Sequence, residues 1–135
     1  MIIPEETDYL FVYGTLMHPF DNPWSQLLRN ESTFIGEGFF PGKLVLVSWY
    51  PGALYIPDFP GYVYGEIYKM NNPKFLIPLL DDYEEINSTP QPYQREVIMV
   101  STEEGKFYPC WVYIYRLPIE NLQVIPEGRF HNHSN

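Results

Sequence analysis

The stretch that decides the fold class is residues 62–86, YVYGEIYKMNNPKFLIPLLDDYEEI, because its hydrophobic period changes midway. Residues 62–70 are rich in β-branched and aromatic side chains and contain no proline, which predicts a strand. Beyond them Asn72 can cap a helix and Pro73 can open one, while Pro78 should kink that helix or tighten a turn. Apolar residues then recur at helical spacing on one predicted face: Phe75, Leu76, Leu79, Leu80 and Tyr83.

The N-terminal part of the chain predicts one strand and one short helix. Residues 9–13 are apolar or aromatic and predict a first strand that ends at Gly14. Asn22 is a candidate N-cap and Pro23 fits the first helical position, so we expect a short helix that runs to about Arg29.

Turns and a hairpin complete the prediction. Pro41-Gly42 and Pro51-Gly52 are turn dipeptides and predict turns between apolar segments. Residues 94–101 and 107–115 are separated by a short glycine-containing turn and predict an antiparallel hairpin. About six strands with aromatic residues on both faces, together with two short helices, predict a closed or nearly closed barrel that leaves few exposed edges.

The composition suits a single domain over residues 1–135, in which the polar end, residues 128–135, is expected to be a flexible tail. Hydrophobic residues make up 45% of the chain and aromatic residues 18%, which favours strands or a ring-lined pocket. The net charge of −9 argues against nucleic acid and against an anionic membrane surface as partners. No run approaches the roughly 18 apolar residues of a membrane span.

The cysteine and the histidines of the chain predict neither a disulfide nor a metal site. Cys110 is the single cysteine, so no internal disulfide can form; a buried, inert thiol and a cytoplasmic location are expected. His18, His131 and His133 have no acidic or cysteine partners at ligand spacing, and we expect no metal. The sequence also lacks a phosphate-binding glycine loop and a dinucleotide fingerprint, so we expect no cofactor.

Four carboxylates lie at the end of the predicted helix. Glu84 follows Leu80 by four residues and is the carboxylate expected to lean towards the core. The three expected to turn to water are Asp81, Asp82 and Glu85. A carboxylate in apolar surroundings has a raised pKa and can act as a general acid or base near neutral pH. The alternative, a fully solvated helix end, is the more frequent outcome for such a cluster.

The second candidate for chemistry is FVYGTL, residues 11–16. Gly14 at the end of a strand permits a positive φ and the close approach of a ligand to the main chain. Successive N–H groups in such a turn can form a concave site for an anion such as a carboxylate. An ordinary turn from strand to loop is the alternative, and isolated glycine turns are common.

Six stretches, taken in order, carry a resemblance to a known family: FVYGTL (11–16), YPGAL (50–54), VYGEIY (63–68), LLDDYE (79–84), YQREVIMV (93–100) and WVYIY (111–115). The chain resembles the γ-glutamylcyclotransferase-like family, and in particular its small members such as γ-glutamylamine cyclotransferase. The resemblance runs from about Tyr9 to Arg129. It implies an α+β fold built on a small mixed β-barrel.

The resemblance also implies roles for individual residues. The family's loop that lines a cavity and holds the substrate through its backbone amides is matched by Tyr13, Gly14, Thr15 and Leu16. Glu84 closes the Leu-Asp-x-x-Glu motif and matches the catalytic glutamate, the proposed general acid and base. Tyr93 and Arg95 match the family's Tyr-x-Arg and are expected to support the substrate pocket.

The activity implied by the resemblance is that of a γ-glutamylcyclotransferase, an acyltransferase or lyase that needs no cofactor. Such an enzyme cyclises the γ-glutamyl group of an amine or peptide to 5-oxoproline and releases the free amine. Its partner is this small-molecule substrate, and a monomer is the default expectation. A non-catalytic small-molecule binding module on the same fold is the alternative. The leaving group, and whether the loop amides hold the α-carboxylate or an oxyanion, stay open at this point.

Overall fold

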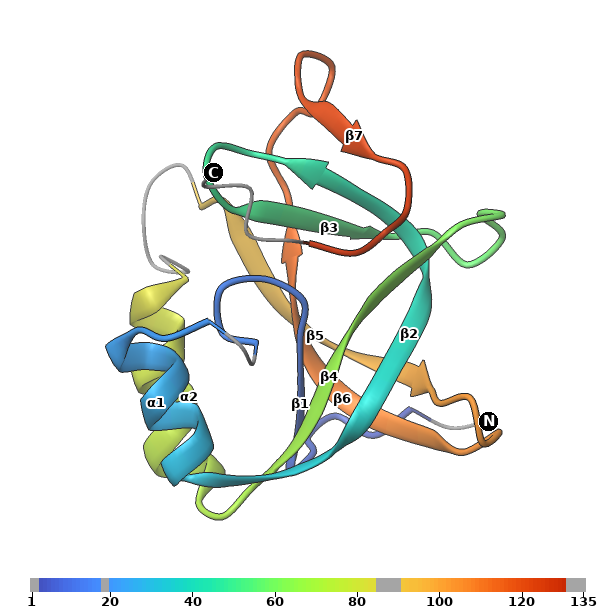
Figure 1. Cartoon of the computed structure of the whole chain (residues 1–135). Coiled ribbons are helices and arrows are strands. Elements are labelled where there is room, and N and C mark those ends of the chain that lie inside the picture. The colour runs from blue at the N-terminus through green and yellow to red at the C-terminus, as the bar shows by residue number, and fades with distance from the viewer. Residues whose placement is uncertain (1–2, 18–19, 85–90, 131–135) are drawn as a thin grey trace.

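Within the residues that the structure describes, 3–17, 20–84 and 91–130, the computed structural model is a closed five-stranded barrel with two further strands and two helices (Figure 1). The predicted class, a small mixed barrel with two short helices, is confirmed. The elements in chain order are β1 (Tyr9–Val12), α1 (Pro23–Asn30), β2 (Ser32–Leu46), β3 (Pro51–Tyr55), β4 (Tyr62–Met70), α2 (Pro73–Tyr83), β5 (Tyr93–Ser101), β6 (Phe107–Tyr115) and β7 (Gln123–Ile125).

The barrel strands are hydrogen-bonded in the order β2-β4-β1-β6-β5, and β5 returns to β2 at the pair Phe39 and Ser101. β1 and β6 run parallel, with Tyr9 opposite Cys110, whereas the other barrel pairs are antiparallel. β3 and β7 pair with the C-terminal part of β2 and form the extension at the top of Figure 1. Closure of the ring leaves the five barrel strands without a free edge, which protects them from pairing with other chains.

The turn predicted at Pro41-Gly42 is wrong, because β2 runs straight through it. Pro41 is the last residue of β2 opposite β4, and from Gly42 onwards the strand pairs with β3. A side chain at Gly42 would place its Cβ 2.0 Å from the carbonyl oxygen of Leu54. The dipeptide therefore marks the point where the strand changes partner and the two backbones come close together.

The turn predicted at Pro51-Gly52 is also displaced, since these two residues begin β3. The chain turns just before them, where the N–H of Val47 donates to the carbonyl of Tyr50 at 3.0 Å. The predicted hairpin is confirmed as β5 and β6, with the turn closed by the N–H of Thr102 donating to the carbonyl of Lys106.

The short helix α1 is confirmed with its predicted cap. The side chain of Asn22 accepts a hydrogen bond from the N–H of Ser25 at 2.8 Å, and the Ser25 hydroxyl accepts one from the N–H of Asn22 at 3.1 Å. This reciprocal pair satisfies two donors that a helix N-terminus otherwise leaves open. Helix α2 begins at Pro73 as predicted, but the side chain of Asn72 makes no capping hydrogen bond.

Helix α2 continues through Pro78, which is exposed, to Tyr83. Its buried face contains Ile77, flanked by Leu76 and Leu80, whereas Phe75 is 48% exposed. The predicted face is confirmed at Leu76 and Leu80, with Leu79 and Tyr83 half-buried, and is wrong only at Phe75. Pro78, which cannot donate a hydrogen bond in the helix interior, lies on the solvent side.

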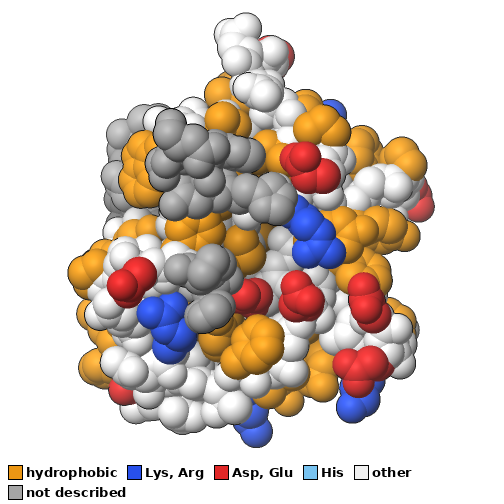
Figure 2. Space-filling view, viewed as in Figure 1, with side chains coloured by type: hydrophobic (Ala, Val, Ile, Leu, Met, Phe, Trp, Pro, Cys, Tyr) orange, Lys and Arg blue, Asp and Glu red, His pale blue; other side chains and the backbone are white. Residues whose placement is uncertain are grey.

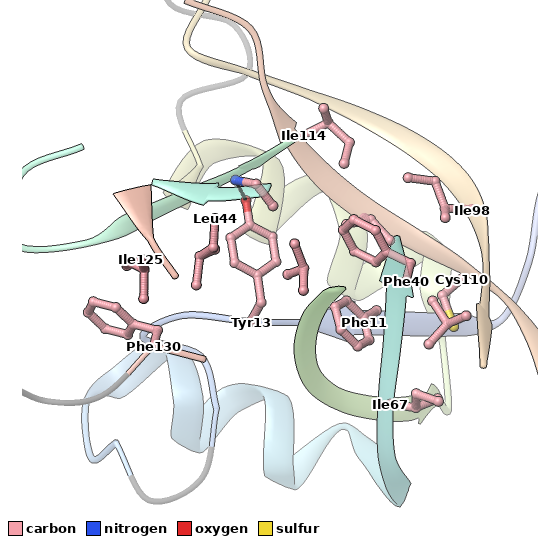
Figure 3. Close-up of a cluster of buried hydrophobic side chains, with 14 residues drawn as sticks. Phe11, Tyr13, Phe40, Leu44, Ile67, Ile98, Cys110, Ile114, Ile125 and Phe130 are labelled. Atoms are coloured by element: carbon pink, nitrogen blue, oxygen red, sulfur yellow. Dashed lines mark hydrogen bonds between the residues drawn. The ribbon is translucent and has the colours of Figure 1, made fainter. Parts of the chain in front are cut away.

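Two hydrophobic clusters meet at β1, which is buried on both faces. Phe11 and Tyr13 point into the cluster inside the barrel, and Leu10 and Val12 point into the cluster that packs against α1 and α2. Phe130 also belongs to the inner cluster, and Figure 3 shows it beside Ile125. The remainder of the expected tail, residues 131–135, lies outside the described residues.

The surface carries charges of both signs. Figure 2 shows acidic, basic and hydrophobic side chains interspersed over one face of the molecule. Among the described residues, no helix combines the length and apolar composition that crossing a membrane requires.

Candidate functional site

A pocket of about 140 Å³ opens where β1 ends and the chain enters the loop that follows it. Its inner wall consists of buried residues, Phe11, Val12, Tyr13, Leu16, Pro51, Tyr93 and Tyr113. Its outer part consists of partly or largely exposed residues, Gly14, Thr15, Trp49, Tyr50, Tyr83 and Glu84. The pocket thus joins segments from β1, the β2–β3 turn, the end of α2, β5 and β6.

The pocket brings together every predicted site residue except Arg95. Tyr13, Gly14, Thr15 and Leu16 contribute one wall, and Glu84 and Tyr93 come from elements more than sixty residues further along the chain. The structure also adds residues that the sequence did not single out as site residues, namely Phe11, Val12, Trp49, Tyr50, Pro51, Tyr83 and Tyr113.

The loop after β1 is held by a hydrogen bond within the loop and by one from the cap of α1. The carbonyl of Gly14 accepts from the N–H of Met17 at 3.0 Å, and the side-chain amide of Asn22 donates to the carbonyl of Thr15 at 2.9 Å. The cap of α1 therefore fixes the loop as well as the helix.

Gly14 does not adopt the positive φ that its position suggested. Its lack of a side chain matters for a different reason, because an added Cβ would lie 3.0 Å from the Cγ of Pro51. None of the N–H groups of Gly14, Thr15 and Leu16 donates a hydrogen bond to another described residue. Among the described residues these three N–H groups thus have no protein acceptor, and all three residues line the pocket.

Two buried tyrosines have their hydroxyl protons committed to the protein. Tyr13 donates to the carbonyl of Tyr113 at 2.5 Å and accepts from the N–H of Ala53 at 3.2 Å, and Figure 3 shows it standing among the inner side chains. Tyr93 donates to the carbonyl of Pro51 at 2.7 Å. Burial raises the pKa of both phenols, so they remain neutral walls of the pocket.

Thr15 and Tyr83 form a hydroxyl pair at the outer wall, with 2.5 Å between their oxygens. One hydroxyl must donate to the other, so a single proton of the pair remains to donate to a bound ligand. Burial raises the pKa of Tyr83, the hydrogen bond with Thr15 lowers it, and the charge of Glu84 raises it further, so that the net direction is upwards.

Glu84 follows the last turn of α2, where its N–H donates to the carbonyl of Leu80 at 2.9 Å. It is half-buried. Its negative charge contributes, after burial, to the raised pKa of four tyrosines around the pocket, Tyr13, Tyr83, Tyr93 and Tyr113. The carboxylate and these phenols therefore share one electrostatic environment.

The expectation that Asp81 turns to water is wrong. Its carboxylate accepts from Nε of Arg95 at 2.9 Å, from Nη2 of the same guanidinium at 3.1 Å, and from the hydroxyl of Tyr113 at 2.7 Å. The side chains of the pair are only 16% and 23% exposed. Asp82 is exposed as expected, and Glu85 lies outside the described residues.

Arg95 stands behind the pocket rather than in its lining. Its guanidinium lies over the ring of Trp111, with Cζ 4.4 Å from the ring centroid. Burial lowers the pKa of Arg95, but hydrogen bonding and proximity to Asp81 outweigh that effect and the net direction is upwards. The pair joins the end of α2, which carries Glu84, to β5 and β6.

No group of three or more His, Cys, Asp or Glu side chains is placed to hold a metal ion within the described residues. His18, His131 and His133 lie outside them. Cys110 is buried as predicted, and burial raises the pKa of its thiol.

The chain is similar to one sequence family, to curated relatives and to solved structures. A family model described as "Gamma-glutamyl cyclotransferase, AIG2-like" matches residues 10–132. YtfP of Escherichia coli K12, a gamma-glutamylcyclotransferase family protein, is 27% identical over 119 residues, which are 88% of this chain and 92% of the relative.

Two solved structures share the fold over nearly the whole chain. An AIG2-like protein from Mus musculus is 27% identical with a TM-score of 0.64, and the match covers 96% of this chain and 99% of the mouse protein. YkqA from Bacillus subtilis is 26% identical with a TM-score of 0.70, and the match covers 93% of this chain. The chain spans only 40% of the length of YkqA.

Proposed function

Because this chain belongs to the gamma-glutamyl cyclotransferase, AIG2-like family, we propose that it converts a γ-glutamyl amine or peptide to 5-oxoproline and a free amine. The observation that carries the proposal is the position of Glu84. This carboxylate lines the same small pocket as Gly14, Thr15 and Leu16 of the loop after β1.

The reaction needs a proton carrier but neither water nor a cofactor. The α-nitrogen of the glutamyl group attacks the γ-carbonyl carbon, a five-membered lactam forms, and the bond from that carbon to the leaving nitrogen breaks. The α-ammonium group loses two protons overall, and the leaving amine gains two to become an ammonium ion. Glu84 takes a proton from the α-nitrogen and returns one to the leaving nitrogen. Such positioned proton transfer contributes about 10²- to 10⁴-fold in rate.

The N–H groups of Gly14, Thr15 and Leu16 are the proposed donors for negative charge on the substrate. They can hold either the α-carboxylate or the oxygen of the γ-carbonyl as negative charge develops on it. The remaining hydroxyl proton of the Thr15–Tyr83 pair is a further donor at the same wall. Tyr93 acts as a wall, because its own hydroxyl proton is already bonded to Pro51. Arg95 acts through Asp81 and Tyr113 rather than on the substrate.

The size of the pocket supports a folded glutamyl group. A cavity of about 140 Å³ is close to the size of one that holds benzene, and 5-oxoproline contains a ring of similar dimensions. The wall therefore favours the curled chain in which the α-nitrogen meets the γ-carbonyl. Pre-organising two reacting groups in this way can contribute about 7 kcal/mol or more to the barrier reduction.

The experiment that tests the proposal is incubation of the purified protein with γ-glutamyl amines and γ-glutamyl dipeptides. We expect 5-oxoproline and free amine in equal amounts. Tight binding of these compounds without any 5-oxoproline would instead identify a binding module on the same fold. We further propose that the protein acts in the cytoplasm, since its single cysteine is a buried thiol, and that it acts as a monomer. Cell fractionation and sedimentation test these two points.

A further inference from the structure

The pocket has an aromatic mouth that the glutamyl group does not occupy. Trp49 lines the pocket yet is 70% exposed, the largest exposed fraction among the large hydrophobic side chains that the structure describes. Its ring meets that of Tyr50 edge to face, with 5.1 Å between centroids and 80° between planes. A single exposed tryptophan on a surface needs no explanation. Trp49, however, lies at the edge of the pocket and contacts the ring of Tyr50. The two rings together form an aromatic surface, here called the platform, on which a ligand can pack.

The order of burial along the pocket fixes which part of the substrate reaches this platform. The inner wall is closed by buried side chains such as Phe11, Tyr93 and Tyr113, each less than 5% exposed. Glu84 is half-buried, between that inner wall and the mouth. The whole pocket, its mouth included, is about 140 Å³, close to the size of one small ring, so a leaving group attached near Glu84 extends outwards past Trp49 and Tyr50.

The charge around the mouth restricts the chemistry of that substituent. Among the described lining residues, Glu84 is the one carboxylate. The whole chain carries a net charge of −9. A leaving group with its own carboxylate, as in a γ-glutamyl amino acid, would lie near the carboxylate of Glu84, and the described lining residues offer it no Lys or Arg. An uncharged ring would instead pack on the exposed indole.

Resting on the proposed function, we infer that Trp49 and Tyr50 form a leaving-group subsite that selects γ-glutamyl derivatives of aromatic amines without a carboxylate. The glutamyl half is common to all substrates of the reaction, so this subsite determines which amine the protein releases. Trp49 is its principal contact, because it offers the larger and more exposed face.

The test compares three substrates that differ by one group each: γ-glutamyl-phenethylamine, γ-glutamyl-ethylamine and γ-glutamyl-phenylalanine. The first exceeds the second by a ring, and the third exceeds the first by a carboxylate. We expect kcat/KM for the phenethylamide to be about tenfold above that for the ethylamide, a preference typical of one good aromatic contact and equivalent to about 1.4 kcal/mol. The phenylalanine derivative should be the poorer of the two aromatic substrates.

Trp49→Ala should reduce the ratio of the phenethylamide to the ethylamide to within about twofold. Phe107→Ala is the matched control, because Phe107 is 54% exposed and does not line the pocket. That variant should keep the wild-type ratio. Equal kcat/KM for all three substrates, a preference for the carboxylate-bearing one, or an unchanged ratio in Trp49→Ala would overturn the subsite.

A binding measurement separates failure of the subsite from failure of the proposed reaction. In Glu84→Gln the uncleaved phenethylamide should bind about tenfold more tightly than the ethylamide, and the difference should disappear when Trp49→Ala is added. If this difference appears but no wild-type turnover does, the proposed cyclisation fails and the aromatic subsite stands. If turnover appears without the difference, the subsite fails and the cyclisation stands.

Discussion

Replacing Asp81 by Asn tests whether the largely buried ion pair between Asp81 and Arg95 holds the end of α2 in place. The substitution keeps the shape of the side chain but removes its charge. It also replaces one carboxylate oxygen with an amide NH₂ group, which faces the guanidinium of Arg95 and cannot accept its hydrogen bond. Wild-type Asp81 accepts three hydrogen bonds, two from Arg95 and one from Tyr113. We therefore expect both a loss of stability and a displaced Glu84, three residues further along.

The magnitude follows from how deeply the pair is buried. Breaking a fully buried pair costs about 3–5 kcal/mol, whereas an exposed pair contributes about 0–1 kcal/mol. At 16% and 23% exposure the pair of Asp81 and Arg95 lies nearer the first limit, so we expect a loss of about 2 kcal/mol. With a typical urea dependence, the unfolding midpoint should fall by about 1 M.

The matched control is Glu96→Gln. Glu96 lies next to Arg95 in β5 and pairs with Arg116, which follows β6, but the side chains of this pair are 34% and 46% exposed. Its loss should cost no more than about 0.5 kcal/mol. Urea unfolding of both variants gives the stabilities, and 5-oxoproline release under folded conditions should show kcat lowered by about tenfold in Asp81→Asn, since a misplaced reactive group costs rate. Equal stability losses in the two variants would refute the account of this pair.

Three further predictions concern the loop, the barrel and pH. Asn22→Ala should lower the stability of the fold by about 1 kcal/mol, because α1 loses its cap; thermal unfolding measures this effect. The same variant should raise KM, because the carbonyl of Thr15 loses its hydrogen-bond donor and the loop is held less firmly. Gly42→Ala should destabilise the fold by about 2 kcal/mol or prevent folding, since the new methyl would overlap the carbonyl of Leu54, and an unchanged melting temperature would contradict that contact. Burial raises the pKa of Tyr13 and Tyr93 above the ordinary 10.0, so the unfolded chain releases protons that the native state keeps. Stability should therefore be full below about pH 10 and fall at higher pH, and a flat unfolding free energy between about pH 9 and about pH 11 would show this to be wrong.

Local patterns in the sequence predicted most elements of the fold. The β-branched and aromatic run of β4, the hairpin of β5 and β6, and the capped start of α1 each depend on interactions between near neighbours. Pro41-Gly42 was misread because the contact that explains it, the close approach of Gly42 to Leu54, joins two different strands. No local signal separates a turn from a strand that changes its partner.

The candidate site was predictable only in part for the same reason. The loop at Gly14 and the carboxylate of Glu84 belong to recognisable motifs, and the pocket contains both. Asp81 was expected in water because its partners, Arg95 and Tyr113, are 14 and 32 residues away and no helical pattern reveals them. The role of Trp49 at the mouth of the pocket was not predicted, because the turn was expected at Pro51-Gly52, whereas the chain turns just before those residues.

The most direct test of the central claim is the rate of 5-oxoproline release by Glu84→Gln beside that of Asp82→Asn. The two carboxylates lie two residues apart, but Glu84 lines the pocket and Asp82 is exposed. With circular dichroism confirming that both variants are folded, the rate should fall by about 10²- to 10⁴-fold in Glu84→Gln and stay near wild type in Asp82→Asn. A Glu84→Gln protein that releases 5-oxoproline at the wild-type rate would contradict the assignment of Glu84 as the proton carrier.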